Sequence, residues 1–186
     1  MSTTTRISLE QYDEMIRQGA FLPREEHRVE LIYGEISPMS PIGPIHDWIV
    51  DLLAEWSILT LPQGAARVRV QGSFGIREFD SAPQPDLAWL RRKDYTRERP
   101  RPEDVLLVIE VADSSLPKDR GLKAELYAKA GITDYWIVNL PGRCVEVRRE
   151  PRDSKYRQLE IFGIGQEVVP LAFPEITLSI SDLFPE

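Results

Sequence analysis

Two stretches decide the fold of this chain: Val-Leu-Leu-Val-Ile-Glu-Val at residues 105–111 and Gln-Pro-Asp-Leu-Ala-Trp-Leu at residues 84–90. Continuous apolar runs of this kind predict strands that are covered on both faces. Each run carries one carboxylate, because Asp86 opens the earlier run and Glu110 closes the later one. If the two strands are antiparallel neighbours, the two carboxylates meet at one end of the sheet. The pattern therefore predicts two converging oxygen ligands, which suit a hard divalent cation such as Mg²⁺.

A structural role for these acids is the alternative, in which each one ends a strand or pairs with a surface arginine. An ionised carboxylate in an apolar strand is costly unless it is paired or binds a metal. One acid at a strand end favours the structural role. Two acids on successive strands, followed by a predicted helix that contains lysines, favour a functional site.

Composition limits the class of protein. The chain has 186 residues, of which 42% are hydrophobic, and four tryptophans, so we expect one folded domain with a large core. Residues 1–27 are expected to form an N-terminal helix and lead-in, and residues 28–186 the core. The net charge of −7 argues against non-specific nucleic-acid binding by bulk charge. A nucleic-acid function would need a local basic patch or phosphates bridged by a metal.

The single cysteine, Cys144, excludes an internal disulfide framework and fits a reducing compartment. Its place in an alternating strand pattern indicates packing rather than nucleophilic chemistry. The N-terminus has no apolar signal core, and no apolar run reaches the length of a membrane span. We therefore expect a cytoplasmic protein without a membrane partner.

Local patterns predict an α/β (α+β) domain with a mixed central β-sheet flanked by helices. Ser8 and Gln11 form a capping box for a helix that ends near Gly19. The first of the other predicted helices spans residues 45–61, and its apolar face consists of Ile45, Trp48, Ile49, Leu52, Leu53, Trp56 and Leu59. The second is capped by Ser114 or Ser115 and runs to Ala130, with Leu122 and Leu126 buried. The predicted strands, hairpins included, are residues 28–33, 35–39, 67–71, 74–77, 85–90, 105–111, 134–139, 143–149, 156–161 and 176–180.

The helix after Glu110 carries Asp119 and Lys123, which are four residues apart and share a helical face. The first interpretation is an exposed ion pair worth about 0.2–0.5 kcal/mol. The second is that Lys123 reaches back to the two carboxylates. Spacing alone leaves both interpretations open.

An ordered series of motifs resembles the Uma family of restriction-endonuclease-like proteins, within the PD-(D/E)XK nuclease superfamily. The matching residues are Arg28–Ile36, Met39-Ser40-Pro41 with His46, Gln84–Leu87, Leu107–Ser115, Asp119-Arg120 with Lys123, and Tyr127–Val138. The resemblance runs from about Arg28 to the C-terminus. It implies a restriction-endonuclease-like fold and a metal-dependent nuclease activity.

The resemblance also implies roles for individual residues. The third position of the superfamily motif is usually lysine, but it is Ala112 in this chain. The Uma family places its lysine on the next helix. Lys123 is therefore the candidate for this role, and Lys118 is the second choice. Asp86, Glu110 and the carbonyl of Val111 would bind Mg²⁺, for which Mn²⁺ can substitute. Lys123 would orient the attacking water or offset charge on the phosphate.

Three further sets of residues have two interpretations each. Glu30 is a further ligand or supporting carboxylate, or else a strand residue paired with Arg28 or Arg24. His46 contacts phosphate or holds a ligand, or else packs on a helix face. The basic loop at residues 91–102 contacts substrate, or is simply solvated; its first members are Arg91, Arg92 and Lys93.

The leading hypothesis is a Mg²⁺-dependent DNA endonuclease that hydrolyses phosphodiester bonds by a metal-activated water. The first alternative is a catalytically inactive nuclease-fold module that binds DNA or protein. The second is a metal-dependent hydrolase of a smaller phosphate ester. Cutting both strands of a duplex favours a homodimer, and we expect the hairpin at residues 135–149 to be an exposed edge that builds its interface.

Overall fold

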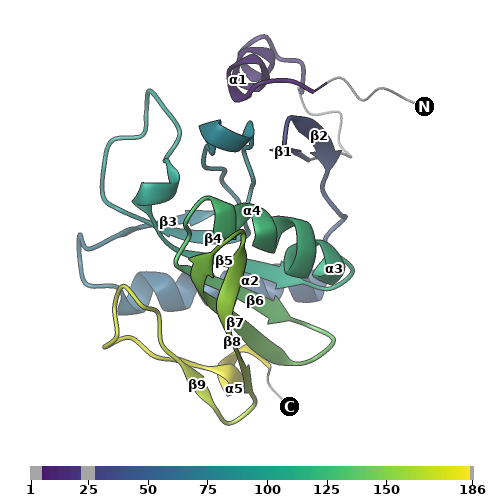
Figure 1. Cartoon of the computed structure of the whole chain (residues 1–186). Coiled ribbons are helices and arrows are strands. Elements are labelled where there is room, and N and C mark those ends of the chain that lie inside the picture. The colour runs from purple at the N-terminus through teal and green to yellow at the C-terminus, as the bar shows by residue number, and fades with distance from the viewer. Residues whose placement is uncertain (1–5, 22–27, 185–186) are drawn as a thin grey trace.

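The computed structural model describes residues 6–21 and 28–184 of the chain. A six-stranded sheet lies at the centre (Figure 1). Its order is β3 (Arg67–Val70), β4 (Leu87–Leu90), β5 (Val105–Ala112), β6 (Asp134–Asn139), β7 (Cys144–Arg152) and β8 (Lys155–Gly163). Only β5 and β6 pair in parallel, and the other neighbours are antiparallel. The predicted mixed sheet is therefore confirmed.

The two acidic strands are neighbours, as the sequence predicts. In the antiparallel ladder of β4 and β5, Leu87 pairs with Ile109. One step further along, Asp86 is opposite Glu110. Every residue of β4 is buried, and β5 is buried apart from Leu106, which matches the expectation for strands covered on both faces.

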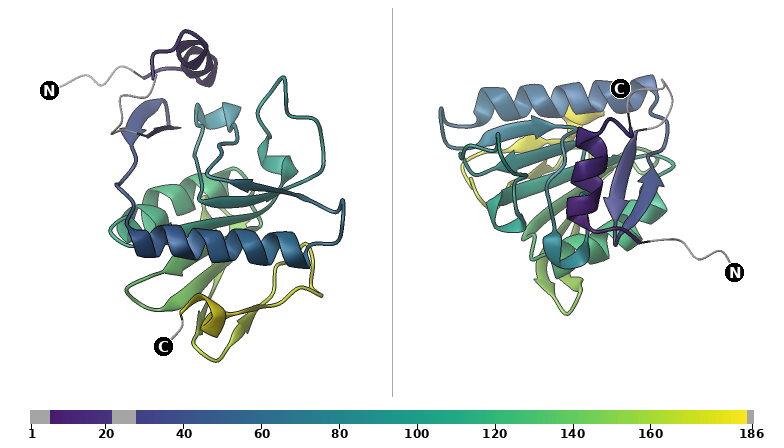
Figure 2. Two further views of the ribbon diagram at one scale, coloured as in Figure 1. Left: turned by 180° about the vertical axis from the view of Figure 1, so that it is seen from behind. Right: turned by 90° about the horizontal axis from the view of Figure 1, so that it is seen from above.

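Helices cover the two faces of the sheet (Figure 2). One face packs against α2 (Pro44–Thr60) and the C-terminal segment, which contains β9 (Glu167–Val168), β10 (Leu178–Ser179) and α5 (Ile180–Leu183). The other face packs against one helical stretch, which consists of α3 (Leu116–Lys118), the π-helical turn η3 (Asp119–Lys123) and α4 (Ala124–Lys129). Two short 3₁₀ turns, η1 (Arg77–Phe79) and η2 (Pro102–Asp104), complete the structure.

A separate N-terminal layer consists of α1 (Leu9–Arg17) and the hairpin of β1 (Val29–Ile32) and β2 (Glu35–Pro38). The predicted capping box at Ser8 is present. The hairpin turns at Tyr33 and Gly34, which both have positive φ, and a Cβ on Gly34 would lie 3.0 Å from the carbonyl oxygen of Ile7. This layer matters for the site because β1 carries Glu30.

Part of the predicted packing of α2 is wrong. Ile45, Trp48 and Leu59 are exposed, whereas His46 and Ser57 face the sheet. Apolar residues lie on more than one side of this helix, so periodicity alone does not select the buried side. A hydrogen bond also helps to determine which side of α2 is buried, because Trp89 Nε1 donates to Ser57 Oγ at 2.8 Å.

Two strand predictions also need correction. Residues 74–77 form no strand in the described chain; Phe74 and Ile76 are buried in the helix-covered core, and Ile76 makes only an isolated bridge to Ser81. The hairpin at residues 135–149 is not an edge, because β6 lies between β5 and β7 and β8 extends the sheet beyond β7. Within the described ranges, no helix is long and apolar enough to span a membrane.

Candidate active site

The ladder between β4 and β5 brings Asp86 to the end of β5. The Val111 N–H donates to Asp86 Oδ2 at 2.9 Å. The N–H and C=O of one strand residue point to the same edge, so the Val111 carbonyl also faces this edge. Pro85 precedes Asp86 and has no N–H to bond that carbonyl. The sequence Pro85-Asp86 thus ends the ladder and leaves two oxygen-bearing groups at the same place.

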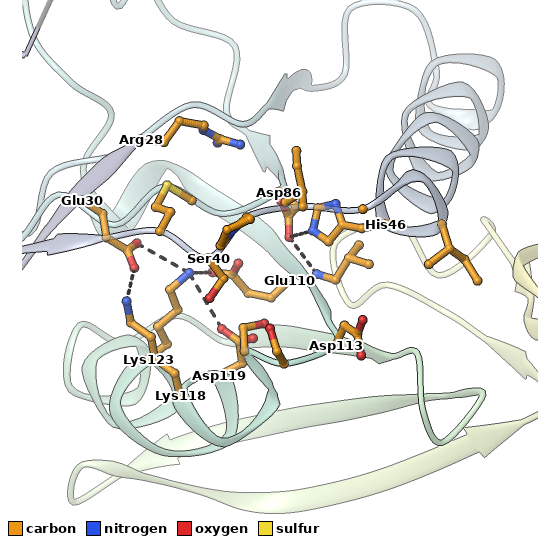
Figure 3. Close-up of a pocket in the computed structure, with 18 residues that line it drawn as sticks. Arg28, Glu30, Ser40, His46, Asp86, Glu110, Asp113, Lys118, Asp119 and Lys123 are labelled. Atoms are coloured by element: carbon orange, nitrogen blue, oxygen red, sulfur yellow. Dashed lines mark hydrogen bonds and ion pairs between the residues drawn. The ribbon is translucent and has the colours of Figure 1, made fainter. Parts of the chain in front are cut away.

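A pocket of about 90 Å³ opens at this end of the sheet. Figure 3 shows that its walls come from β1, the start of α2, the end of β5 and the η3 turn. Six of the charged or titratable residues that line it are Glu30, His46, Asp86, Glu110, Asp119 and Lys123. All six are buried.

Lys123 reaches the two-acid site because the helix changes geometry at η3. The π-helical turn places both Asp119 and Lys123 inward, with Lys123 only 4% exposed, and turns Leu122 outward with 41% exposure. The prediction that Leu122 is buried is therefore wrong. Tyr135 OH donates to the Asp119 carbonyl at 3.0 Å and so bonds a backbone group of the turn. π-Turns within helices occur frequently at functional sites.

The ammonium of Lys123 lies among three carboxylates. Its Nζ atom is 2.9 Å from Glu110 Oε1, 3.5 Å from Glu30 Oε2 and 3.8 Å from Asp119 Oδ1. Burial alone would lower the pKa of Lys123, but these three negative charges outweigh burial and raise it. Lys123 is therefore a permanent cation in this pocket.

Glu110 has the opposite tendency. Burial raises its pKa to about 8, with contributions from Asp119 and the other nearby acids, although Lys123 opposes the shift. The raised pKa of Lys123 favours a charged pair, whereas the raised pKa of Glu110 favours a neutral acid. Burial dominates at Glu110, because the charge of Lys123 is shared among three acids. Tyr127 OH also donates to Glu110 Oε1, at 2.7 Å, and fixes the carboxylate in place.

Glu30 connects the N-terminal layer to the site. Lys118 Nζ donates to its Oε1 at 2.8 Å, and the Gln84 N–H to its Oε2 at 3.3 Å. Burial alone would raise the pKa of Glu30, but Lys123 and Lys118 outweigh burial and lower it. The alternative partner Arg28 instead donates to the Gln84 side chain at 3.2 Å, and Arg24 lies outside the described residues.

His46 comes from the first turn of α2 and contacts Asp86. Its Nε2 is 3.3 Å from Asp86 Oδ2, while its buried Nδ1 has no hydrogen-bond partner among the described residues. Burial would lower the pKa of His46, but Asp86 outweighs burial and raises it. The contact orients Asp86, and it leaves both interpretations of His46 open.

The predicted substrate-contacting residues lie elsewhere. Arg91, Arg92 and Lys93 follow the opposite end of β4 from Asp86 and do not line the pocket. Arg91 Nε donates to the Glu103 carbonyl at 3.0 Å, and Lys93 forms an ion pair with Asp104. Their contact with substrate stays a prediction.

Sequence reasoning missed Tyr127 as a site residue and treated Asp119 only as an ion-pair partner. Tyr127 is four residues after Lys123, as Lys123 is after Asp119, so helical spacing was the available signal. The decisive signal is burial, which the sequence does not give.

The donor chemistry of the pocket fits a hard divalent cation. Asp86 and Glu110 offer carboxylate oxygens and Val111 a carbonyl, which are the ligand types that Mg²⁺ prefers. Within residues 6–21 and 28–184, however, no group of three or more His, Cys, Asp and Glu side chains is arranged to hold a metal ion. The fit therefore depends on two side chains, with backbone and solvent oxygens as the other ligands.

Comparisons with known proteins identify the fold and the family. No curated protein matches the chain. A crystal structure described as a "putative nuclease belonging to DUF820", from Anabaena variabilis ATCC 29413, has the same fold. It superimposes with a TM-score of 0.69 at 21% identity, over 96% of this chain and 97% of the other. The model of the Uma2 family, described as "Putative restriction endonuclease", matches residues 9–181, and the chain belongs to that family.

Proposed function

We propose that this protein is a Mg²⁺-dependent endonuclease that hydrolyses phosphodiester bonds in DNA. The observation that carries the proposal is the meeting of Asp86 and Glu110 at the end of two adjacent strands, with the Lys123 ammonium 2.9 Å from Glu110. Membership of a family described as restriction endonucleases supports DNA as the substrate. Two carboxylates and a lysine at one place are the groups that a metal-assisted hydrolysis of a phosphodiester needs.

Charge in the pocket favours a divalent cation. Four buried carboxylates, those of Glu30, Asp86, Glu110 and Asp119, face the two ammonium groups of Lys118 and Lys123. When all four acids are ionised, the pocket carries two uncompensated negative charges. In this proposal Asp86, Glu110 and the Val111 carbonyl hold Mg²⁺. When bound, the ion supplies Lewis-acid stabilisation of the scissile phosphate and lowers the pKa of the attacking water.

The side chains of the chain perform the other tasks. Lys123 orients the attacking water or offsets negative charge that develops on the phosphate, because its pKa is raised and it stays cationic. Tyr127 and His46 fix the two carboxylates through hydrogen bonds to Glu110 Oε1 and Asp86 Oδ2. Glu30 keeps Lys118 and Lys123 near the site.

An inactive binding module is the second candidate, and one observation favours it. Ala112 occupies the position where the nuclease superfamily places its lysine, and the Lys123 ammonium is already 2.9 Å from Glu110 Oε1. In that case the Lys123–Glu110 pair would replace the metal and hold the fold together. The two candidates differ in their response to Mg²⁺.

The test is a cleavage assay on duplex, single-stranded and branched DNA, with Mg²⁺ or with a chelator. The proposal expects Mg²⁺-dependent cleavage of DNA that Asp86→Asn abolishes. The matched control is Asp113→Asn, because Asp113 also lines the pocket but is exposed. Asp113→Asn should retain cleavage.

Absence of cleavage of every DNA substrate by the folded wild type would overturn the proposal in favour of the inactive module. Hydrolysis of small phosphate esters without cleavage of DNA would instead support the small-ester hydrolase. Equal loss in both aspartate variants would mean that general negative charge, and not the position of Asp86, matters.

A further inference from the structure

The outer edge of β8 is an unpaired side of the central sheet. β8 has nine residues and pairs with β7 in one register, from Cys144 with Gly163 to Arg152 with Lys155, with one gap opposite Glu150, whose φ is positive. No other strand of the described residues pairs with its second edge. Its middle carries two exposed apolar side chains, Leu159 at 51% and Ile161 at 59%. Figure 1 shows β8 as the last strand on its side of the sheet.

Soluble proteins normally protect such edges with prolines, bulges, short strands or central lysines. The opposite edge of this sheet is protected in that way, because β3 has only four residues and carries Arg67 and Arg69. β8 is more than twice as long and has no proline; its lysine, Lys155, is at the end, and the charged Arg157 and Glu160 flank the exposed Leu159. A long unprotected edge with exposed leucine and isoleucine is typical of a strand that pairs with another chain.

We propose that β8 pairs with β8 of a second copy of this protein, antiparallel, around a two-fold axis at Leu159. Leu159 is the central residue of the strand, so this register pairs residues 157–161 of the two copies, while the N–H and carbonyl of Gly163 at the strand end are already bonded to Gln166. The two sheets then form one continuous sheet across the dimer. A two-fold interface of this kind uses the same patch on both copies.

Side chains in this register are complementary. Leu159 faces Leu159 of the second copy, and Ile161 faces the aliphatic part of its Arg157, so the four exposed apolar side chains form one cluster. Gln158 faces Glu160 of the second copy. Within one chain the Gln158 side chain already donates to the Glu160 carboxylate, and the same pair of groups can form the same hydrogen bond between the copies. No two like charges are directly opposite, which is the arrangement that stabilises cross-strand pairs.

The charged side chains of β8 favour a protein over a nucleic acid as the partner at this edge. Arg157 is already paired with Asp153 at 2.7 Å, so β8 presents one compensated cation and one anion in its middle rather than a basic strip. Phosphate contacts require free Lys and Arg groups. The self-complementary order of the strand selects a second copy rather than an unrelated protein. This inference is independent of the proposed nuclease activity.

Sedimentation equilibrium of the full chain tests the interface. The wild type should have twice the mass of one chain at micromolar concentration. Leu159→Arg should have the mass of one chain, because it places two like charges face to face at the axis. The matched control is Leu59→Arg, which replaces an exposed leucine on α2 and should stay dimeric. Thermal melts of both variants check that they fold.

The register has its own test in a Cys144→Ser background. A short thiol-specific cross-linker should join Leu159→Cys between copies, because only the register centred on residue 159 places that residue opposite itself, with Cβ atoms about 4.5–5.5 Å apart. Leu59→Cys should not be joined. A monomeric wild type, or a dimer that Leu59→Arg dissociates and Leu159→Arg does not, would overturn the proposal. A Leu159-dependent dimer without the cross-link would overturn the register.

Discussion

Glu110 gives the most precise prediction of stability. Its pKa is raised by burial from 4.5 to about 8, so between these two pH values the folded chain holds a proton on Glu110 that the unfolded chain releases. The free energy of unfolding must then fall as pH rises through this interval. At about 1.4 kcal/mol per pH unit, the whole interval corresponds to an upper limit of about 5 kcal/mol. Glu110→Gln removes the titration and keeps an acceptor for Lys123 and Tyr127.

Urea unfolding without metal, between pH 3 and pH 9, measures this effect. The stability of Glu110→Gln relative to wild type should increase from pH 5 to about pH 8 and then level off. Glu146→Gln is the control of opposite sign. Burial would raise the pKa of Glu146, but Arg120 and its other partners outweigh burial and lower it, so that variant should lose stability relative to wild type as pH rises from 3 to 6. A difference between Glu110→Gln and wild type that does not change with pH would refute the reasoning.

Three further predictions concern the same pocket. Lys123→Met should destabilise the fold by about 3–5 kcal/mol near neutral pH, because three buried acids lose their shared cation, and acidification should reduce the loss; urea unfolding at two pH values measures it. Tyr127→Phe should cost about 1–3 kcal/mol and lower the rate of DNA cleavage, because Glu110 Oε1 loses a 2.7 Å hydrogen bond; an unchanged rate would remove Tyr127 from the site. Millimolar Mg²⁺ or Mn²⁺ should raise the melting temperature of the wild type by mass action, and Asp86→Asn should lose most of this response; equal responses would make Asp86 structural.

The sequence predicted the parts of the fold that depend on local patterns. Asp86 and Glu110 could be placed together because Val/Ile/Leu runs define strands, and the two acids meet if those strands are antiparallel neighbours, which they are. The capping box at Ser8 depends on two nearby side chains and was also predictable. The role of Lys123 followed from the family resemblance, because its spacing from Asp119 fits an exposed ion pair as well as a site residue.

Features that depend on competition between distant groups were not predictable. The buried side of α2 is set partly by what His46 and Ser57 bond on the sheet, and both bonds cross about 30 to 40 residues of sequence. The π-turn at η3 leaves no clear mark in Asp119–Lys123, and the burial of Lys123 within it depends on how this turn packs against the sheet. An alanine at position 123 is therefore not the harmless change that an exposed helix position would allow.

The edge of the sheet was also beyond local patterns. The hairpin of β6 and β7 is evident from Pro141-Gly142, but which of its strands is internal depends on the long-range pairing of β5 with β6. Parallel pairing has no turn signal in the sequence. The expected dimer edge was the hairpin of β6 and β7, whereas β8 pairs with the outer side of β7 and forms the actual edge.

Calorimetric titration with Mn²⁺ at pH 8 tests the central claim, that Asp86 and Glu110 together hold the metal. Mn²⁺ should bind to the wild type and to Asp113→Asn, and binding should be lost in Asp86→Asn and in Glu110→Gln. Binding should also release protons, in a number that increases as pH is lowered from 8 to 6, because Glu110 is protonated without metal. Equal Mn²⁺ affinity in all four proteins, or no binding to the folded wild type, would contradict this claim.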